Sequence, residues 1–148
     1  MTHHKQLNIG LFGFGVVGEG LYKVLQKTPS LSASIKKVCI KDTTKKRNAP
    51  ASLFTTDRDE LLNDEDINVI VEVINESEPA FQIVTTALRN GKSVVSASKK
   101  MIAEHLPELL ALQQETGQSF LYESAACASI PVIRNLEEYY DNDLLHGI

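Results

Sequence analysis

The sequence predicts an α/β fold, a doubly wound parallel sheet in one domain that covers residues 1–148. Short apolar stretches bounded by turn residues alternate with segments of helical periodicity, which is the order of a parallel sheet with crossover helices. A Gly-x-Gly-x-x-Gly motif lies directly after the first apolar stretch and opens the first helix. No repeat, low-complexity tract or linker interrupts this order. The alternation is continuous from residue 7 to about residue 123.

The first part of the chain predicts two strands and two helices. Leu7–Phe12 is a short buried strand, and Val16–Gln26 carries its apolar residues on one helical face before Pro29 ends the helix. Ile35–Ile40 is the second strand, and a polar loop follows it. Asp57-Arg-Asp-Glu60 has the form of a capping box and opens a short helix.

The remaining elements repeat the same pattern. Asn68–Ile74 is a near-continuous run of β-branched residues, as expected for a strand buried on both faces. Proline near the start and glycine at the end mark the helices that follow. In order, the later elements are a helix from Pro79 to Gly91, a strand Ser93–Ser96, a helix Pro107–Gly117, a strand Ser119–Tyr122, and a helix from Pro131 to Tyr139 or Tyr140.

Composition excludes several functional classes. The formal net charge is −4 and no long run of Lys and Arg occurs, so we expect no nucleic-acid partner. No apolar run approaches the roughly 20 residues that span a bilayer, and the first residues lack a signal-peptide core, so we expect no membrane span. Cys39 and Cys127 lie in apolar stretches, which favours buried free thiols in a reducing cytoplasm over a disulfide between them.

The glycine motif, Gly13-Phe14-Gly15-Val16-Val17-Gly18, predicts a dinucleotide site. In this motif Gly13 permits the tight turn, Gly15 lets the backbone approach a pyrophosphate, and Gly18 lets helix and strand pack closely. The helix N-terminus adds free N–H groups and a partial positive charge. A ligand-free strand-to-helix turn is the alternative, but the strand before and the helix after the motif favour a Rossmann-type dinucleotide-binding domain.

The end of the second predicted strand bears on the choice between NAD and NADP. A residue there normally contacts the adenosine ribose, and the strand ends in Ile40-Lys41-Asp42. Asp42 is suited to accept hydrogen bonds from both ribose hydroxyls, which favours NAD. Lys41, with the basic residues of 45–47, is suited to a 2′-phosphate, which favours NADP. The loop residues are equally well explained as solvated surface, so the choice stays open.

Two further positions are candidates for chemistry. Lys99 and Lys100 follow the strand Ser93–Ser96, at the carboxyl edge where ligands bind in such folds. One of them is suited to donate a hydrogen bond or proton to a substrate, although a lysine pair opening a helix is more often solvated surface. Glu123 is either a site carboxylate or an ordinary edge residue. The four histidines are scattered, and no cluster has transition-metal spacing.

Several segments together resemble the amino-terminal part of homoserine dehydrogenases. The resemblance covers essentially the whole chain, and its lysine segment and its Glu-to-Ile-Pro segment are more specific than the glycine motif. The segments are Gly13–Gly18, Phe54-Thr-Thr-Asp57, Val69-Ile-Val-Glu72, Asn90–Lys99, and Tyr122-Glu123 followed by Ile130-Pro131.

The resemblance implies an NAD(P)-dependent oxidoreductase that interconverts L-aspartate 4-semialdehyde and L-homoserine, in threonine and methionine biosynthesis. It implies that residues 13–18 hold the pyrophosphate and that Lys41 contacts the adenosine ribose or its phosphate. It places Lys99 on the substrate side of the nicotinamide. It also implies a monovalent-cation site at Glu123, with backbone oxygens near Ala126 and Ala128.

Four positions depart from the family pattern. The family usually has Gly-Gly where this chain has Asn75-Glu76, Asn where it has Ser98, Ala where it has Ser124, and Gly where it has Ala128. We assign Asn75 and Ser98 to the cofactor site and expect Glu76 to reshape its nicotinamide end. Ser98 keeps a hydroxyl but lacks an amide, which alters substrate contacts.

Length is the largest departure. Family members continue into a substrate and dimerisation domain, so the resemblance implies a homo-oligomeric parent that binds a small-molecule substrate. We expect this 148-residue chain, as a shortened form, to bind NAD or NADP without efficient turnover. A non-catalytic NAD(P)-binding or sensing module is the alternative, favoured by the length and by Asn75, Glu76 and Ser98. A third hypothesis, that the chain belongs to another semialdehyde or imine reductase, is the least favoured of the three.

Overall fold

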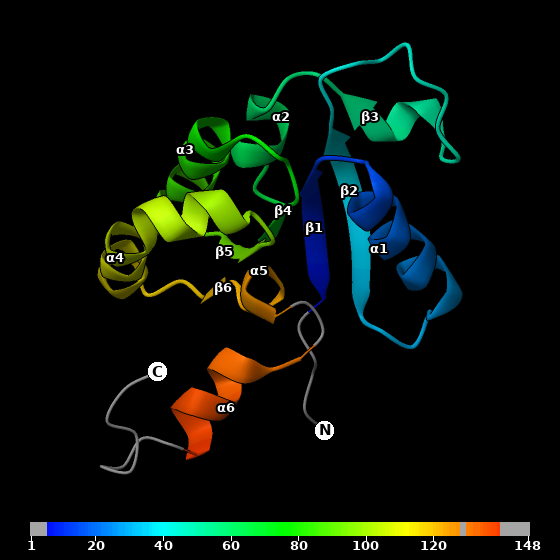
Figure 1. The fold of residues 1–148 in the computed structure, drawn as a ribbon. Helices are drawn as coiled ribbons and strands as arrows, with labels where there is room; N and C mark the ends of the chain where they lie inside the picture. The colour runs from blue at the N-terminus through cyan, green and yellow to red at the C-terminus, as the bar shows by residue number, and fades with distance from the viewer. Residues whose placement is uncertain (1–5, 128–129, 140–148) are drawn as a thin grey trace.

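A six-stranded, all-parallel sheet forms the centre of the domain in the computed structural model, which describes residues 6–127 and 130–139. The strand order is β3-β2-β1-β4-β5-β6, so the chain returns past β1 between β3 and β4. The predicted doubly wound α/β fold is therefore confirmed (Figure 1). The strands are β1 Leu7–Phe12, β2 Ala33–Cys39, β3 Phe54–Thr55, β4 Val69–Glu72, β5 Ser93–Ser96 and β6 Phe120–Leu121.

Helices cover the two faces of the sheet unequally. Helices α2, α3 and α4 pack on one face, and α1 lies on the other (Figure 1). No helix of the described ranges is long and apolar enough to cross a membrane. The helices are α1 Val16–Lys27, α2 Asp59–Leu62, α3 Ser77–Arg89, α4 Lys99–Thr116, α5 Glu123–Cys127 and α6 Val132–Tyr139, with a 3-10 turn at Ala51–Leu53.

Alternation along the strands divides the core. Phe12 and Ile70 face the larger cluster beneath α3 and α4, whereas Leu11 and Val71 face the smaller cluster beneath α1. On the α1 face an apolar groove of about 790 Å³ runs along β1, β4 and β5 beside α1. Of the side chains that line the groove, Leu21 and Leu25 of α1 and Val69 and Val95 of the strands are half-buried, and Ile9 and Val71 are buried.

The predicted start of the helix at Pro107 is wrong. Helix α4 begins at Lys99 and contains Pro107 in its interior. A proline there removes one helical hydrogen bond and typically costs about 3 kcal/mol. Buried side chains on both sides of it hold the helix together, namely Met101, Ile102, Leu109 and Leu112. Burial of apolar side chains along the whole segment therefore outweighs the tendency of proline to begin a helix.

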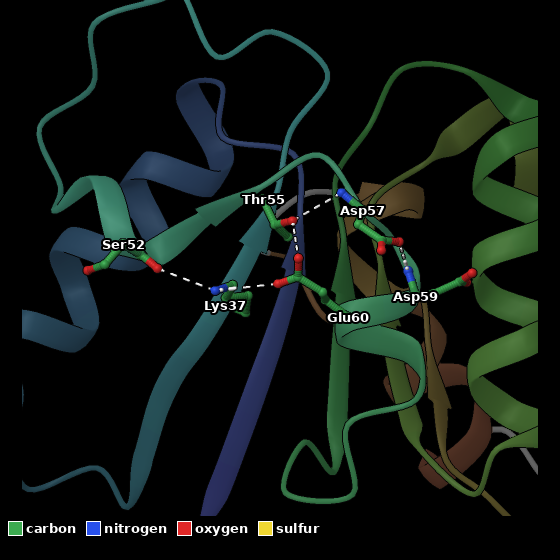
Figure 2. Close-up of polar contacts among 6 residues, drawn as sticks. All are labelled: Lys37, Ser52, Thr55, Asp57, Asp59 and Glu60. Atoms are coloured by element: carbon green, nitrogen blue, oxygen red, sulfur yellow. Dashed lines mark hydrogen bonds and ion pairs between the residues drawn. The ribbon is translucent and has the colours of Figure 1, made fainter.

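The predicted capping box is also wrong. Helix α2 has Arg58 at its N-cap with no side-chain capping bond, and Asp57 Oδ1 accepts a hydrogen bond from Asp59 N at 2.9 Å. Glu60 does not reach back to Asp57, because its Oε1 accepts from Thr55 Oγ1 at 2.9 Å and its Oε2 pairs with Lys37 Nζ at 3.4 Å (Figure 2). Glu60 thus ties α2 to β2 and β3.

The short strand β3 pairs with β2, which carries the thiol of Cys39. β3 was not predicted, and its two residues are in a strand because they pair with Val38 and Cys39 of β2. The described Cys39 is a free thiol, half-buried, and burial raises its pKa. The side chain of Cys127 lies outside the described part of the chain.

Candidate functional site

The glycine loop begins with a backbone that favours glycine. Gly13 has a φ of +99°, in the region that side-chain-bearing residues rarely adopt. Its N–H donates to Cys39 O at 3.1 Å, and an added Cβ would lie 3.0 Å from Val73 O. Gly13 is therefore held between the ends of β2 and β4, and the turn directs the chain into α1.

Gly15 and Gly18 form a cradle. A Cβ at Gly18 would lie 2.3 Å from the carbonyl oxygen of Gly13, so only glycine lets α1 approach the loop this closely. A Cβ at Gly15 would meet no protein atom within 4 Å, and Gly15 is the N-cap of α1 without a side-chain capping bond. The first N–H groups of a helix have no intrahelical partner. Open space, backbone donors and a helix N-terminus therefore coincide here, which fits a pyrophosphate.

The other loop residues leave this space open. The Phe14 ring packs edge-on against Phe54 and Tyr22, with centroid separations of 5.0 and 5.8 Å. The Val16 and Val17 side chains are 93% and 63% exposed, and Val17 lines the apolar groove. Phe14 and Val17 are thus directed toward neighbouring features, the Phe14 ring toward Phe54 and Tyr22 and the Val17 side chain toward the groove.

Lys41 and Glu76 form an ion pair between the carboxyl ends of β2 and β4. Both side chains are largely exposed. Sequence reasoning expected Glu76 at the nicotinamide end, whereas its carboxylate contacts the residue predicted for the adenosine ribose. The partner of Lys41 could not be read from the sequence, because 35 residues separate the two.

Asp42 turns onto its own loop. Its Oδ1 accepts hydrogen bonds from Thr44 N at 2.8 Å and Thr44 Oγ1 at 2.6 Å, and these bonds lower the pKa of the Asp42 carboxyl. In the same loop Arg47 lies 5.4 Å above the Phe54 ring and donates to Lys45 O. These contacts hold the loop together. They engage Asp42, the candidate for the ribose hydroxyls, and Arg47, one of the basic candidates for a 2′-phosphate.

Glu72 is a buried carboxyl that sequence reasoning did not assign to the site. It ends β4 with no exposed surface; Ser96 Oγ donates to its Oε2 at 2.6 Å and Ile74 N to its Oε1 at 2.7 Å. Burial raises its pKa, and the two hydrogen bonds offset part of that rise. The Ser96 hydroxyl also accepts from Ser98 N at 3.2 Å. The signal in the sequence was a charged residue at the end of a β-branched run.

This network positions the two loops predicted for the nicotinamide end. Glu72 and Ser96 are register partners on the adjacent strands β4 and β5. Asn75 lies three residues beyond Glu72 and is exposed, and Ser98 lies two beyond Ser96 and is buried. The structure therefore brings Asn75 and Ser98 to the same edge of the sheet, with Glu72 beneath both loops.

The two lysines at the start of α4 differ in their contacts. Lys100 pairs with Glu104 one turn along the helix, at 3.7 Å. Lys99 is exposed and has no ion pair with any residue of the described ranges. Lys99 follows Ser98 directly at the carboxyl edge, so it is the lysine left available to a ligand there.

Glu123 contacts the backbone of α6. Its Oε1 accepts from Ile133 N at 2.9 Å and its Oε2 from Arg134 N at 3.2 Å. Both oxygens thus cap the first turn of this helix. Ala128, named with Glu123 for the cation site, lies outside the described residues, and no group of three His, Cys, Asp or Glu suited to a metal occurs within the described ones.

Comparison with known proteins identifies the family. Residues 13–123 match the family described as "Homoserine dehydrogenase, NAD binding domain". The homoserine dehydrogenase of Bacillus subtilis is 36% identical over 94% of this chain, and that of Synechocystis is 32% identical over 96%. This chain spans about a third of the length of these relatives, 34% of each.

Solved structures agree. The homoserine dehydrogenase of Thiobacillus denitrificans matches 90% of this chain and 33% of its own, with a TM-score of 0.82 and 31% identity. A hyperthermophilic archaeal homoserine dehydrogenase, solved in complex with NADPH, matches 88% of this chain and 47% of its own, with a TM-score of 0.73 and 25% identity. The chain therefore belongs to the homoserine dehydrogenase family and corresponds to its NAD-binding domain.

Proposed function

We propose that this chain binds a nicotinamide dinucleotide over the loop of residues 13–18 and serves as the cofactor-binding part of a homoserine dehydrogenase. The observation that carries the proposal is the cradle at Gly15, open to solvent and bordered by the N-terminus of α1. Family membership and an archaeal relative solved with NADPH support it. The reaction proposed for the whole enzyme is the interconversion of aspartate semialdehyde and homoserine.

The geometry supports a direction for the cofactor across the sheet edge. With the pyrophosphate at Gly15, the adenosine ribose would lie toward Lys41 and Asp42 after β2, as in other doubly wound folds. The nicotinamide end would lie toward Asn75 and Ser98, after β4 and β5. The bound nicotinamide supplies the hydride chemistry, and the chain contributes binding and orientation.

Lys99 is the residue we propose on the substrate side. It is exposed beside Ser98 and has no ion pair within the described ranges, so its ammonium group is available to a polar substrate. A positive charge there would hold the substrate oxygen and stabilise negative charge that develops on it. Most substrate contacts would come from a further domain, so we expect this chain alone to bind cofactor without efficient turnover.

The proposed compartment, oligomeric state and cation site each rest on one feature of the structure. The free thiol of Cys39 is consistent with a reducing, cytoplasmic compartment. The accessible apolar groove beside α1 is consistent with contact to further polypeptide in a homo-oligomeric enzyme. A monovalent cation near Glu123 would have to share that carboxylate with the backbone of α6.

Adding one methyl group to Gly15 tests the proposal. Gly15→Ala adds a Cβ that meets no protein atom within 4 Å, so the fold should persist while the approach to the pyrophosphate is blocked. Gly20→Ala is the matched control, because its Cβ also meets nothing within 4 Å and lies inside α1. Calorimetric titration with NAD and with NADP should show saturable binding to the wild type and to Gly20→Ala.

For Gly15→Ala we expect the dissociation constant to rise at least about tenfold, because the added methyl group removes one or more contacts between the backbone and the pyrophosphate. Circular dichroism should show that both variants keep the wild-type helix content. If neither dinucleotide binds the folded wild-type chain at millimolar concentration, the proposed function is wrong. If Gly15→Ala binds as tightly as Gly20→Ala, the cradle is not where the pyrophosphate lies.

A further inference from the structure

The Lys41–Glu76 ion pair extends across the end of a strand. Lys41 follows β2 and Glu76 follows β4, and β1 lies between these two strands in the sheet. Neighbouring strands are about 4.8 Å apart, so β2 and β4 are separated by roughly 10 Å. The two long side chains close this distance on the carboxyl side of β1, where the turn at Gly13 begins.

The Lys41 end of this ion pair lies after β2, where a dinucleotide's adenosine ribose is expected. In doubly wound folds ligands bind outside the carboxyl ends of the strands, and the residue ending the second strand contacts the ribose. A carboxylate in that place accepts hydrogen bonds from the two ribose hydroxyls. A 2′-phosphate brings nearly two negative charges to the same place and is repelled by a carboxylate.

The neighbouring groups leave Glu76 as the acidic group best placed for this role. Asp42, the acid expected from the sequence, has its Oδ1 engaged by Thr44 within its own loop. Arg47 is directed over the Phe54 ring. Lys41 is neutralised by Glu76 itself, so a 2′-phosphate would have to compete with a carboxylate for this lysine.

We propose that Glu76 sets the cofactor preference of this chain toward NAD. It does so by accepting hydrogen bonds from the ribose hydroxyls and by holding Lys41 away from a 2′-phosphate. The inference rests on the proposed dinucleotide site and adds the residue that discriminates between the two cofactors.

Calorimetric titration of the 148-residue chain with NAD and with NADP tests it, using Glu76→Gln and the control Glu115→Gln. Both substitutions remove one exposed carboxylate, and Glu115 lies in the last turn of α4, away from the ion pair. We expect the wild type and Glu115→Gln to bind NAD more tightly than NADP. Glu76→Gln should bind NADP about tenfold more tightly than the wild type and NAD no more tightly, the size expected for removing one nearby like charge in water.

The outcomes separate the two proposals. If both dinucleotides bind but Glu76→Gln leaves the ratio of their dissociation constants as in the wild type, the role of Glu76 is refuted and the dinucleotide site stands. A wild type that prefers NADP also refutes it. If neither dinucleotide binds any of the three folded forms, the proposed function fails and this inference fails with it. Circular dichroism and thermal unfolding of each form establish that it is folded.

Discussion

Removing the buried carboxyl of Glu72 should loosen the carboxyl edge of the sheet. Its two oxygens accept hydrogen bonds from Ser96 Oγ and Ile74 N, and no solvent reaches the side chain. Glu72→Ala leaves both donors without this acceptor, and each buried unsatisfied group costs about 1–3 kcal/mol. Part of that loss is offset because a buried charge is also removed. We therefore expect Glu72→Ala to lower the free energy of unfolding by about 2–4 kcal/mol.

Glu72→Gln distinguishes the effect of the Glu72 charge on stability from the effect of its hydrogen bonds. An amide of the same shape still accepts from Ile74 N, and the Ser96 hydroxyl can rotate to accept from its NH₂ group. Because burial raises the pKa of Glu72, this carboxyl ionises near pH 4.5 in the unfolded chain but at higher pH in the folded one. Between those two values the folded state binds more protons, so the Glu72 contribution to stability falls as pH rises through that window.

Urea unfolding followed by circular dichroism at several pH values above and below 4.5 measures both effects. Relative to wild type, Glu72→Gln should become steadily more stable as pH rises through the window, and the difference should be constant above it. Glu115→Gln serves as the control, because its exposed carboxylate should give a small difference with little pH dependence. If the free energy of unfolding of Glu72→Ala falls by less than about 1 kcal/mol, the argument is contradicted, because the loss of an acceptor by two buried donors should cost more than that.

Four further outcomes are expected. Gly18→Ala should lower the urea midpoint clearly, because its Cβ would lie 2.3 Å from the Gly13 carbonyl oxygen. Pro107→Ala should raise the free energy of unfolding by about 1–3 kcal/mol, since it restores a helical hydrogen bond inside α4; no gain would mean that α4 already accommodates the proline without cost. Glu123→Ala should lower the helix content measured by circular dichroism, because α6 loses its cap. The proposed role of Lys99 predicts that, in a homoserine dehydrogenase containing this domain, Lys99→Ala lowers kcat and leaves cofactor affinity nearly unchanged; lost cofactor binding with turnover intact would refute the assignment.

The main elements of the fold were predictable because their signals are local. Leu7–Phe12 was predicted as a strand and is β1, and β4 lies within the predicted run Asn68–Ile74. A continuous apolar run, a helical period and a glycine motif each depend on neighbouring residues alone. The need for glycine at Gly13 and Gly18 is also local, because Gly13 forms the tight turn at positive φ and Gly18 lies against the Gly13 carbonyl oxygen.

Other features depended on partners distant in the sequence. β3 contains two residues, and pairing with β2 makes them a strand, whereas β6 lies within the predicted strand Ser119–Tyr122. Pro107 lies inside α4 because buried residues on both sides of it hold the helix against the core. Glu60 matched a capping box by spacing, but its carboxylate binds Lys37 of β2 and Thr55 of β3 instead.

The sequence by itself determined the fold class and the glycine cradle, because periodicity and glycine placement encode burial and backbone shape residue by residue. It also indicated the family, through segments such as Asn90–Lys99 and Tyr122-Glu123. Only the tertiary structure decided which charged groups meet. Lys41 and Glu76 come together because the sheet order places β1 between their strands, and Glu72 meets Ser96 because β4 and β5 are neighbours. Side-chain partners at the edge of a parallel sheet are set by strand order, which no single segment of the chain contains.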